Sequence, residues 1–158
     1  MSVWIRTLIF IGLSVAAMGQ ELATQRNLSL PIAKSIAEAA LAACQEQGFH
    51  TTVVVVDRSG QVMVVLRDEQ ASAVTLEMAR RKAYTARMFG NTLELQKRTE
   101  DPKYAAQRDI KEILALGGGV PIQVGQETIG GVASSGAGQE EDDACAKAGV
   151  AKVADSLK

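Results

Sequence analysis

Aromatic residues and histidine are scarce in this sequence of 158 residues, which contains one Trp, two Tyr, three Phe and a single His. One histidine excludes a metal site built from several imidazoles and any catalytic device that needs two of them. The sequence also lacks a CxxC pair, a P-loop and a nucleophile elbow. No acid–base or nucleophile constellation is visible, which leaves enzymatic activity undecided and favours a binding protein.

Charge of either sign is not in excess. The 17 basic and 18 acidic residues give a formal net charge of −1. This balance provides no general attraction to nucleic acid or to an anionic membrane surface. We therefore expect no nucleic-acid partner.

The one long apolar run lies at the N-terminus. Residues 1–6 carry a single positive charge, an apolar run follows from Leu8 to Ala17, and Ala17-Met18-Gly19 has small residues where a signal peptidase reads. A membrane anchor is the alternative, but the run has only about 10 residues where a spanning helix needs about 20. We expect residues 1–19 to be a cleaved signal peptide. Residues 20–158 would then be a single domain, periplasmic or secreted, without a membrane span.

Cysteine is limited to Cys44 and Cys145. Outside the cytoplasm the two thiols could form a disulfide, which would close a loop of about a hundred residues. Two separate buried thiols are the equal alternative, because free cysteine packs like a small apolar side chain.

Hydrophobic periodicity predicts helices and two hairpins along the chain. Ser29 and Pro31 are typical of a helix start, and Gly48 of a helix end. The further helices are expected at 74–89, 91–97 and 139–157, and the strands at 51–56, 61–67, 120–124 and 128–134, while 110–116 is ambiguous between helix and strand. Gly130 and Gly131 inside a strand indicate that another backbone lies very close. This order predicts an α+β fold, an antiparallel sheet with helices on both faces.

Three clusters could bind a ligand. The run Gly117–Gly119 could present backbone N–H groups to an anion, although composition favours a simple turn that leads into a strand. The basic helix residues Arg80, Arg81, Lys82 and Arg87 could pair with a carboxylate, or form a solvated or oligomeric face. The acidic run 140–143 suits the start of a helix and needs no bound cation.

Several motifs resemble the GlcG/HbpS-type haem-binding family, in matching order and spacing. They are Val54-Val55-Val56-Asp57 with Gly60, residues 81–86 with Phe89, and the segments 117–122, 129–132 and 134–136. The resemblance covers nearly all of the mature chain. It implies a profilin-like fold with a five-stranded antiparallel sheet and helices on both sides, and assembly into dimers or octamers. Some family members bind haem, and others have no settled activity.

The resemblance implies haem as the cofactor but supplies no iron ligand. Haem iron accepts N, O and S donors, so the candidates are His50 first, Tyr104 next, then Met88 and the hydroxyl of Thr92. The remaining ligand-binding residues that we expect, with basic ones for the propionates, are Arg80, Lys82, Tyr84, Arg87, Phe89, Gly118 and Gly119. The segment 98–108 departs from the Gly- and Pro-rich loop expected of the family.

The leading hypothesis is therefore an extracytoplasmic haem or tetrapyrrole-binding protein, a carrier or a sensor accessory. A module that binds another small metabolite without haem, and a purely structural oligomer, are the alternatives. An enzyme acting on small hydroxy-acids would need an acid–base pair that the sequence does not show.

Overall fold

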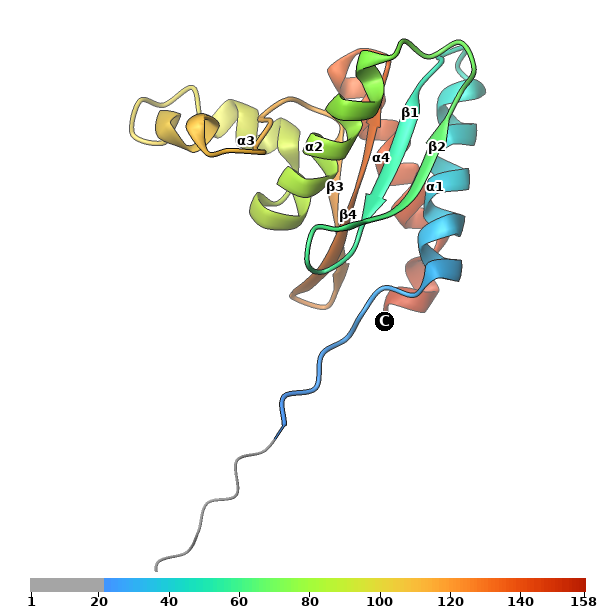
Figure 1. Ribbon diagram of the computed structural model, residues 1–158, viewed down its shortest axis with the longest axis horizontal. Coiled ribbons are helices and arrows are strands. Elements are labelled where there is room, and N and C mark those ends of the chain that lie inside the picture. Colours follow the sequence, from blue (N-terminus) through green and yellow to red (C-terminus); the bar gives the residue numbers. More distant parts are fainter. Residues whose placement is uncertain (1–21) are drawn as a thin grey trace, which may run out of the picture.

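A four-stranded antiparallel sheet forms the centre of the molecule, which we describe from a computed structural model for residues 22–158 (Figure 1). The strands are β1 (Thr52–Val56), β2 (Val62–Arg67), β3 (Gly119–Val124) and β4 (Glu127–Ser135). The helices are α1 (Leu30–Gln45), α2 (Val74–Phe89), α3 (Thr92–Arg98) and α4 (Gln139–Lys152), with 3₁₀ helices η1 (Ala105–Asp109) and η2 (Ala154–Leu157). The expected signal peptide lies outside the described residues. No helix in residues 22–158 is long and apolar enough to cross a membrane.

The sheet has the order β2-β1-β4-β3, so each hairpin contributes one central and one edge strand. The expectation of five strands is wrong, and the fifth strand came only from the family resemblance. The ambiguous segment 110–116 forms a bend and a turn at 110–112 and is irregular from 113 to 116, so it does not pair with an edge of the sheet. The described chain therefore builds its sheet from the two predicted hairpins alone.

Helices cover both faces of this sheet, as the sequence predicts. β1 is a run of β-branched residues with every side chain buried. Val53 and Val55 belong to the core shared with α1 and α4, whereas Val54 and Val56 pack with Ala79 and Ala83 of α2. The central strand is thus apolar on both sides because each side meets a helix.

Glycine allows the close contact between α2 and the sheet that the sequence indicates. A Cβ atom added at Gly131 of β4 would overlap the carbonyl oxygen of Ala83 in α2. A Cβ at Gly130 would lie 2.6 Å from the carbonyl oxygen of Val56. No side chain fits at either position, so α2 and β1 approach the β4 backbone directly.

Cys44 and Cys145 form a disulfide bond between α1 and α4, with their Cα atoms 5.5 Å apart. Both cysteines are fully buried. The sequence left open whether the two cysteines form a disulfide or remain separate thiols, and in the structure they form the disulfide.

The segment from α3 to η1, residues 92–109, projects from the body beside α2 (Figure 1). We call it the arm. Asn91 caps its first helix, because the side-chain oxygen accepts hydrogen bonds from the N–H groups of Leu93 and Glu94. Tyr104 lies in the arm with the cationic groups of Lys103 and Arg98 at 4.8 and 5.8 Å from its ring centre.

Candidate functional site

His50 lies in the loop between α1 and β1, at the end of the sheet where β1 begins. Its Nδ1 atom is 3.0 Å from Oδ1 of Asp68, which directly follows β2. The His50 side chain is 44% exposed, whereas Asp68 is 5% exposed. The imidazole is therefore anchored on one side by a buried carboxylate and open to solvent on the other.

Asp68 is itself held by further hydrogen bonds. Gln45 Nε2, at the end of α1, donates to Oδ2 at 2.9 Å, and the backbone N–H of Gln70 donates to Oδ1 at 2.9 Å. The Gln45 and Gln70 hydrogen bonds, with a smaller contribution from His50, hold the pKa of Asp68 below its ordinary value. The carboxylate thus ties α1, β2 and His50 together as an acceptor.

A buried hydroxyl lies next to His50 in the sequence. Thr51 is fully buried, and its Oγ1 has no hydrogen-bond partner among the described residues. A buried polar atom without a partner is rare in proteins. Its neighbour Thr52 is satisfied by Oγ1 of Thr75 in α2, at 2.7 Å.

The arginines of α2 are already engaged within the chain. Arg80 donates to both Glu77 and Glu112, and these contacts raise its pKa above the ordinary value. Arg87 Nε donates to the carbonyl oxygen of Arg58 at 2.6 Å. A propionate that binds Arg80 would have to compete with two carboxylates.

Lys82 does not share the basic surface of α2, which corrects the expectation for this residue. It is 1% exposed, and its Nζ donates to Oδ2 of Asp142 at 3.0 Å and to the carbonyl oxygen of Ser134 at 3.2 Å. Burial holds the pKa of Lys82 below its ordinary value, against the opposing effect of Asp142. The ammonium is enclosed, so Lys82 is not available to a propionate in this structure.

Two N–H groups of the triple glycine are taken by side chains of the same chain. The Gly117 N–H donates to Gln139 Oε1 at 3.0 Å, and the Gly119 N–H donates to Thr92 Oγ1 at 2.8 Å. The structure therefore favours the turn that enters β3 over an anion cradle. Gly118 is buried against Lys82, so neither Gly118 nor Gly119 offers an open binding surface.

Two of the other predicted ligands, Tyr84 and Met88, both lie beside the turn at Gly60, whereas Thr92 and Tyr104 belong to the arm. Met88 is 40% exposed, Tyr84 and Phe89 are half-buried, and Thr92 is fully buried. The Tyr84 ring lies against the turn at Gly60, where a Cβ would be 2.6 Å from Tyr84 Cδ2. Tyr104 lies in the arm, away from the α1–β1 loop.

The structure does not bring His50 and Arg87 together. His50 precedes β1, and Arg87 contacts Arg58, which follows β1. The five residues of this strand span about 17 Å at roughly 3.3 Å each. His50 and Arg87 therefore lie at opposite ends of β1 within one subunit.

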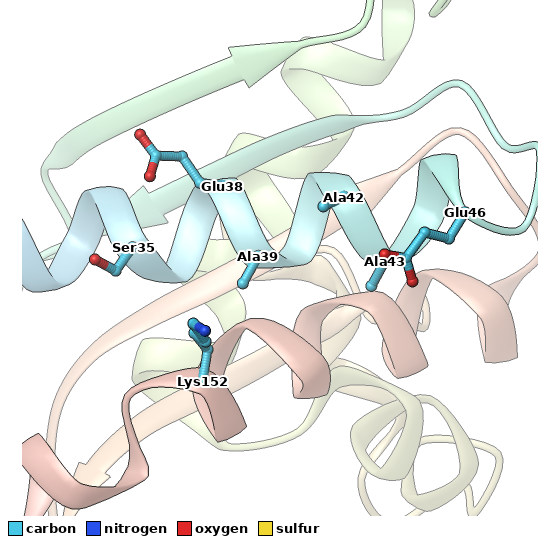
Figure 2. Close-up of a pocket in the computed structure, with 7 residues that line it drawn as sticks. All are labelled: Ser35, Glu38, Ala39, Ala42, Ala43, Glu46 and Lys152. Carbon is cyan, nitrogen blue, oxygen red and sulfur yellow. The ribbon is translucent and has the colours of Figure 1, made fainter.

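Two grooves lie elsewhere on the surface. One, of about 380 Å³, runs between α1 and α4 over Ala39, Ala42 and Ala43, with Glu38, Glu46 and Lys152 at its rim (Figure 2). The second, of about 340 Å³, is lined by Leu28, Ile32, Val124, Ile129 and Leu157 together with the polar residues Arg26, Asn27, Ser156 and Lys158. Neither includes a predicted ligand residue.

A family model described as haem degrading protein, HbpS-like, matches residues 28–151. The chain belongs to the HbpS-like family. A double mutant of Streptomyces reticuli HbpS has a similar crystal structure, with 37% sequence identity and a TM-score of 0.79 over 87% of this chain and 94% of that one. No curated protein matches the chain.

Two further solved structures are similar to this HbpS-like chain. A PduOC–haem complex is 28% identical, with a TM-score of 0.72 over 79% of this chain and 94% of that one. The ORFY protein of Klebsiella pneumoniae is 22% identical, with a TM-score of 0.79 over 85% and 96% of the two chains, and shows the shared fold alone.

Sequence reasoning named His50 as a candidate iron ligand but did not name its partner Asp68. Asp68 follows the second strand of the first hairpin, and the antiparallel pairing of Thr52 with Arg67 brings this end of β2 beside the start of β1. A polar residue directly after a predicted hairpin, opposite the only histidine, is the signal that could have found the pair.

Proposed function

We propose that this protein binds haem, or a related tetrapyrrole, outside the cytoplasm and serves as a carrier or a sensor accessory. Family membership and the similar PduOC–haem complex support haem as the ligand class. The apolar run and the small residues at 17–19 support export.

The observation that carries this proposal is the orientation of His50. Asp68 is hydrogen-bonded to the Nδ1 atom of His50. Nε2 is therefore the nitrogen that is left for a ligand on the exposed side of the ring. A carboxylate or carbonyl on the second nitrogen is the usual arrangement of histidines that bind metals. The donor chemistry of this pair therefore fits a nitrogen ligand for haem iron.

Bound haem would supply an iron atom, which His50 Nε2 would hold as a nitrogen donor. Asp68 would orient the imidazole, and the hydrogen bonds from Gln45 and from the Gln70 N–H would hold Asp68 in place. Tyr104 remains the second candidate for the iron and Arg87 a candidate for a propionate, but each would serve a different haem position from His50 or act across subunits. A single haem site that combines these positions would require an oligomer in which they meet.

A haemin titration tests the proposal. Tag-free protein covering residues 20–158 is titrated with haemin while the Soret band is recorded, and we expect a saturable shift at micromolar concentrations. The absence of such a shift would contradict haem binding. Adding a reductant and oxygen to the complex then separates binding, in which the Soret band persists, from degradation, in which it is lost.

Matched variants locate the iron ligand. His50→Ala should change the Soret position, whereas Tyr104→Phe should leave it unchanged. The opposite result would move the ligand to the arm. Cell fractionation of the full-length chain tests its export, and light scattering after gel filtration measures its oligomeric state.

A further inference from the structure

The hydrogen-bonding pattern of Asp68 determines which nitrogen of His50 is free. Oδ2 accepts from Gln45 Nε2 at 2.9 Å, while Oδ1 accepts from the backbone N–H of Gln70 at 2.9 Å and lies 3.0 Å from His50 Nδ1. Both carboxylate oxygens act as acceptors. The bond to His50 therefore requires the proton on Nδ1.

We propose that Asp68 is a positioning residue for haem iron: it fixes the Nδ1–H tautomer of His50, so that Nε2 alone is the iron donor. This inference rests on the proposed function. Asp68 touches neither iron nor porphyrin in this arrangement, and acts only through the imidazole.

The different exposure of the two side chains indicates that Asp68 orients His50, and not the reverse. Asp68 is 5% exposed and held from α1 and from its own loop, so its position is fixed before any ligand arrives. The 44% exposed imidazole would otherwise rotate freely about its side-chain bonds. A histidine that binds a metal must hold one orientation and one tautomer. A histidine that is only solvated at the surface needs neither.

The carboxylate should also change the strength of the donor. A hydrogen bond from Nδ1–H to an anion increases the electron density on Nε2 and makes it a more basic ligand. A more basic axial ligand favours ferric over ferrous iron. Removing the negative charge from Asp68 should therefore weaken the iron–imidazole bond and raise the reduction potential of bound haem.

The single histidine makes the first test unambiguous. In tag-free protein labelled with ¹⁵N-histidine, all imidazole signals come from His50. At a pH where the ring is neutral, we expect the Nδ1–H tautomer to predominate in the wild-type protein and the Nε2–H tautomer to increase in Asp68→Ala. Glu69→Ala is the matched control, because Glu69 is an exposed carboxylate one position away. A wild-type protein with predominant Nε2–H would overturn the inference.

The second test uses haem-loaded protein and the isosteric variant Asp68→Asn, which preserves the shape of the loop. We expect a 10- to 100-fold loss of haemin affinity, the range that loss of such a partner produces. The iron–histidine stretching band of the ferrous complex should move to lower frequency, and the reduction potential should rise. Glu69→Gln should change none of these. Urea unfolding of each variant distinguishes a loosened loop from an altered ligand.

The outcomes separate the two proposals. No saturable Soret shift in the wild-type protein would overturn both of them. Normal haemin binding with an unchanged spectrum in His50→Ala would overturn this inference alone. Equal iron–histidine bands and equal potentials in Asp68→Asn and Glu69→Gln would also overturn it and leave haem binding intact.

Discussion

Lys82 and Asp142 form an ion pair that is closed to solvent, with Nζ and Oδ2 3.0 Å apart and the two side chains 1% and 2% exposed. The pair connects the middle of α2 to the first turn of α4 across the end of β4. This one contact therefore links α2 to α4, and no local sequence pattern predicts it.

Removing one member of this pair should destabilise the fold strongly. Lys82→Met leaves the Asp142 carboxylate buried without its partner, and we expect a loss of about 3–5 kcal/mol in the free energy of unfolding. Urea unfolding followed by circular dichroism measures the change. Lys147→Met is the control, because Lys147 is 61% exposed in its pair with Asp143 and should cost about 1 kcal/mol or less. Equal losses in the two variants would contradict the importance of the buried pair.

Of the three consecutive glycines, Gly118 should lose the most stability when it is replaced by alanine. Its φ is +118°, and a Cβ would lie 2.7 Å from Ser134 O, 2.8 Å from Asp142 Cβ and 2.9 Å from Lys82 Nζ. Gly118→Ala must therefore displace backbone and the ion pair, which should cost about 3 kcal/mol or more beyond the strain of positive φ. Gly125→Ala separates the two effects, because Gly125 also has positive φ, at +60°, but nothing within 4 Å of a Cβ. Similar melting temperatures for both variants would exclude crowding as the cause.

The disulfide should contribute a large part of the stability. Its cysteines are 101 residues apart, and a loop of about 100 residues corresponds to roughly 4.7 kcal/mol in the chain-entropy treatment. We expect Cys44→Ala/Cys145→Ala to unfold at lower urea concentration than the oxidised wild-type protein, and reductant to shift only the wild-type curve. A reductant-independent wild-type curve would contradict the prediction.

Thr92 should stabilise the entry into β3 through its hydroxyl. Oγ1 accepts the Gly119 N–H at 2.8 Å, and both residues are buried. Thr92→Val keeps the shape and leaves this N–H without an acceptor, which should cost about 1–3 kcal/mol. Thr92→Ser keeps the hydroxyl and should cost less. A serine variant that is no more stable than the valine variant would assign the effect to packing of the methyl group.

The sequence predicts most elements of the fold because their signals are local. The Val-rich run before Asp57 forms β1, Asn91 caps α3, and the paired glycines of β4 lie against α2 and β1. The last helix is shorter than expected: α4 ends at Lys152 and the 3₁₀ helix η2 continues to Leu157. The expected strand number was wrong because the fifth strand rested on the family resemblance and on no segment of this chain.

The candidate site was harder to predict, because its contacts join distant segments. Lys82 lies three residues after Ala79 and four before Ala86, on the buried face of α2, and this spacing could have indicated its burial. Leu76, three residues before Ala79, is 43% exposed although the same spacing would place it on the buried face. Nothing near Lys82 identifies Asp142, which is 60 residues away and becomes a partner only after the sheet has formed.

The position of the bridge has a consequence for how the molecule is made. Cys44 lies in the last turn of the first helix and Cys145 in the second turn of α4, so nearly the whole chain must have been synthesised before their sulfurs can meet. Until then Cys44 remains a free thiol. Oxidation of this pair therefore requires a chain that extends at least to Cys145, and a molecule that ends before this residue would keep an unpaired thiol at Cys44.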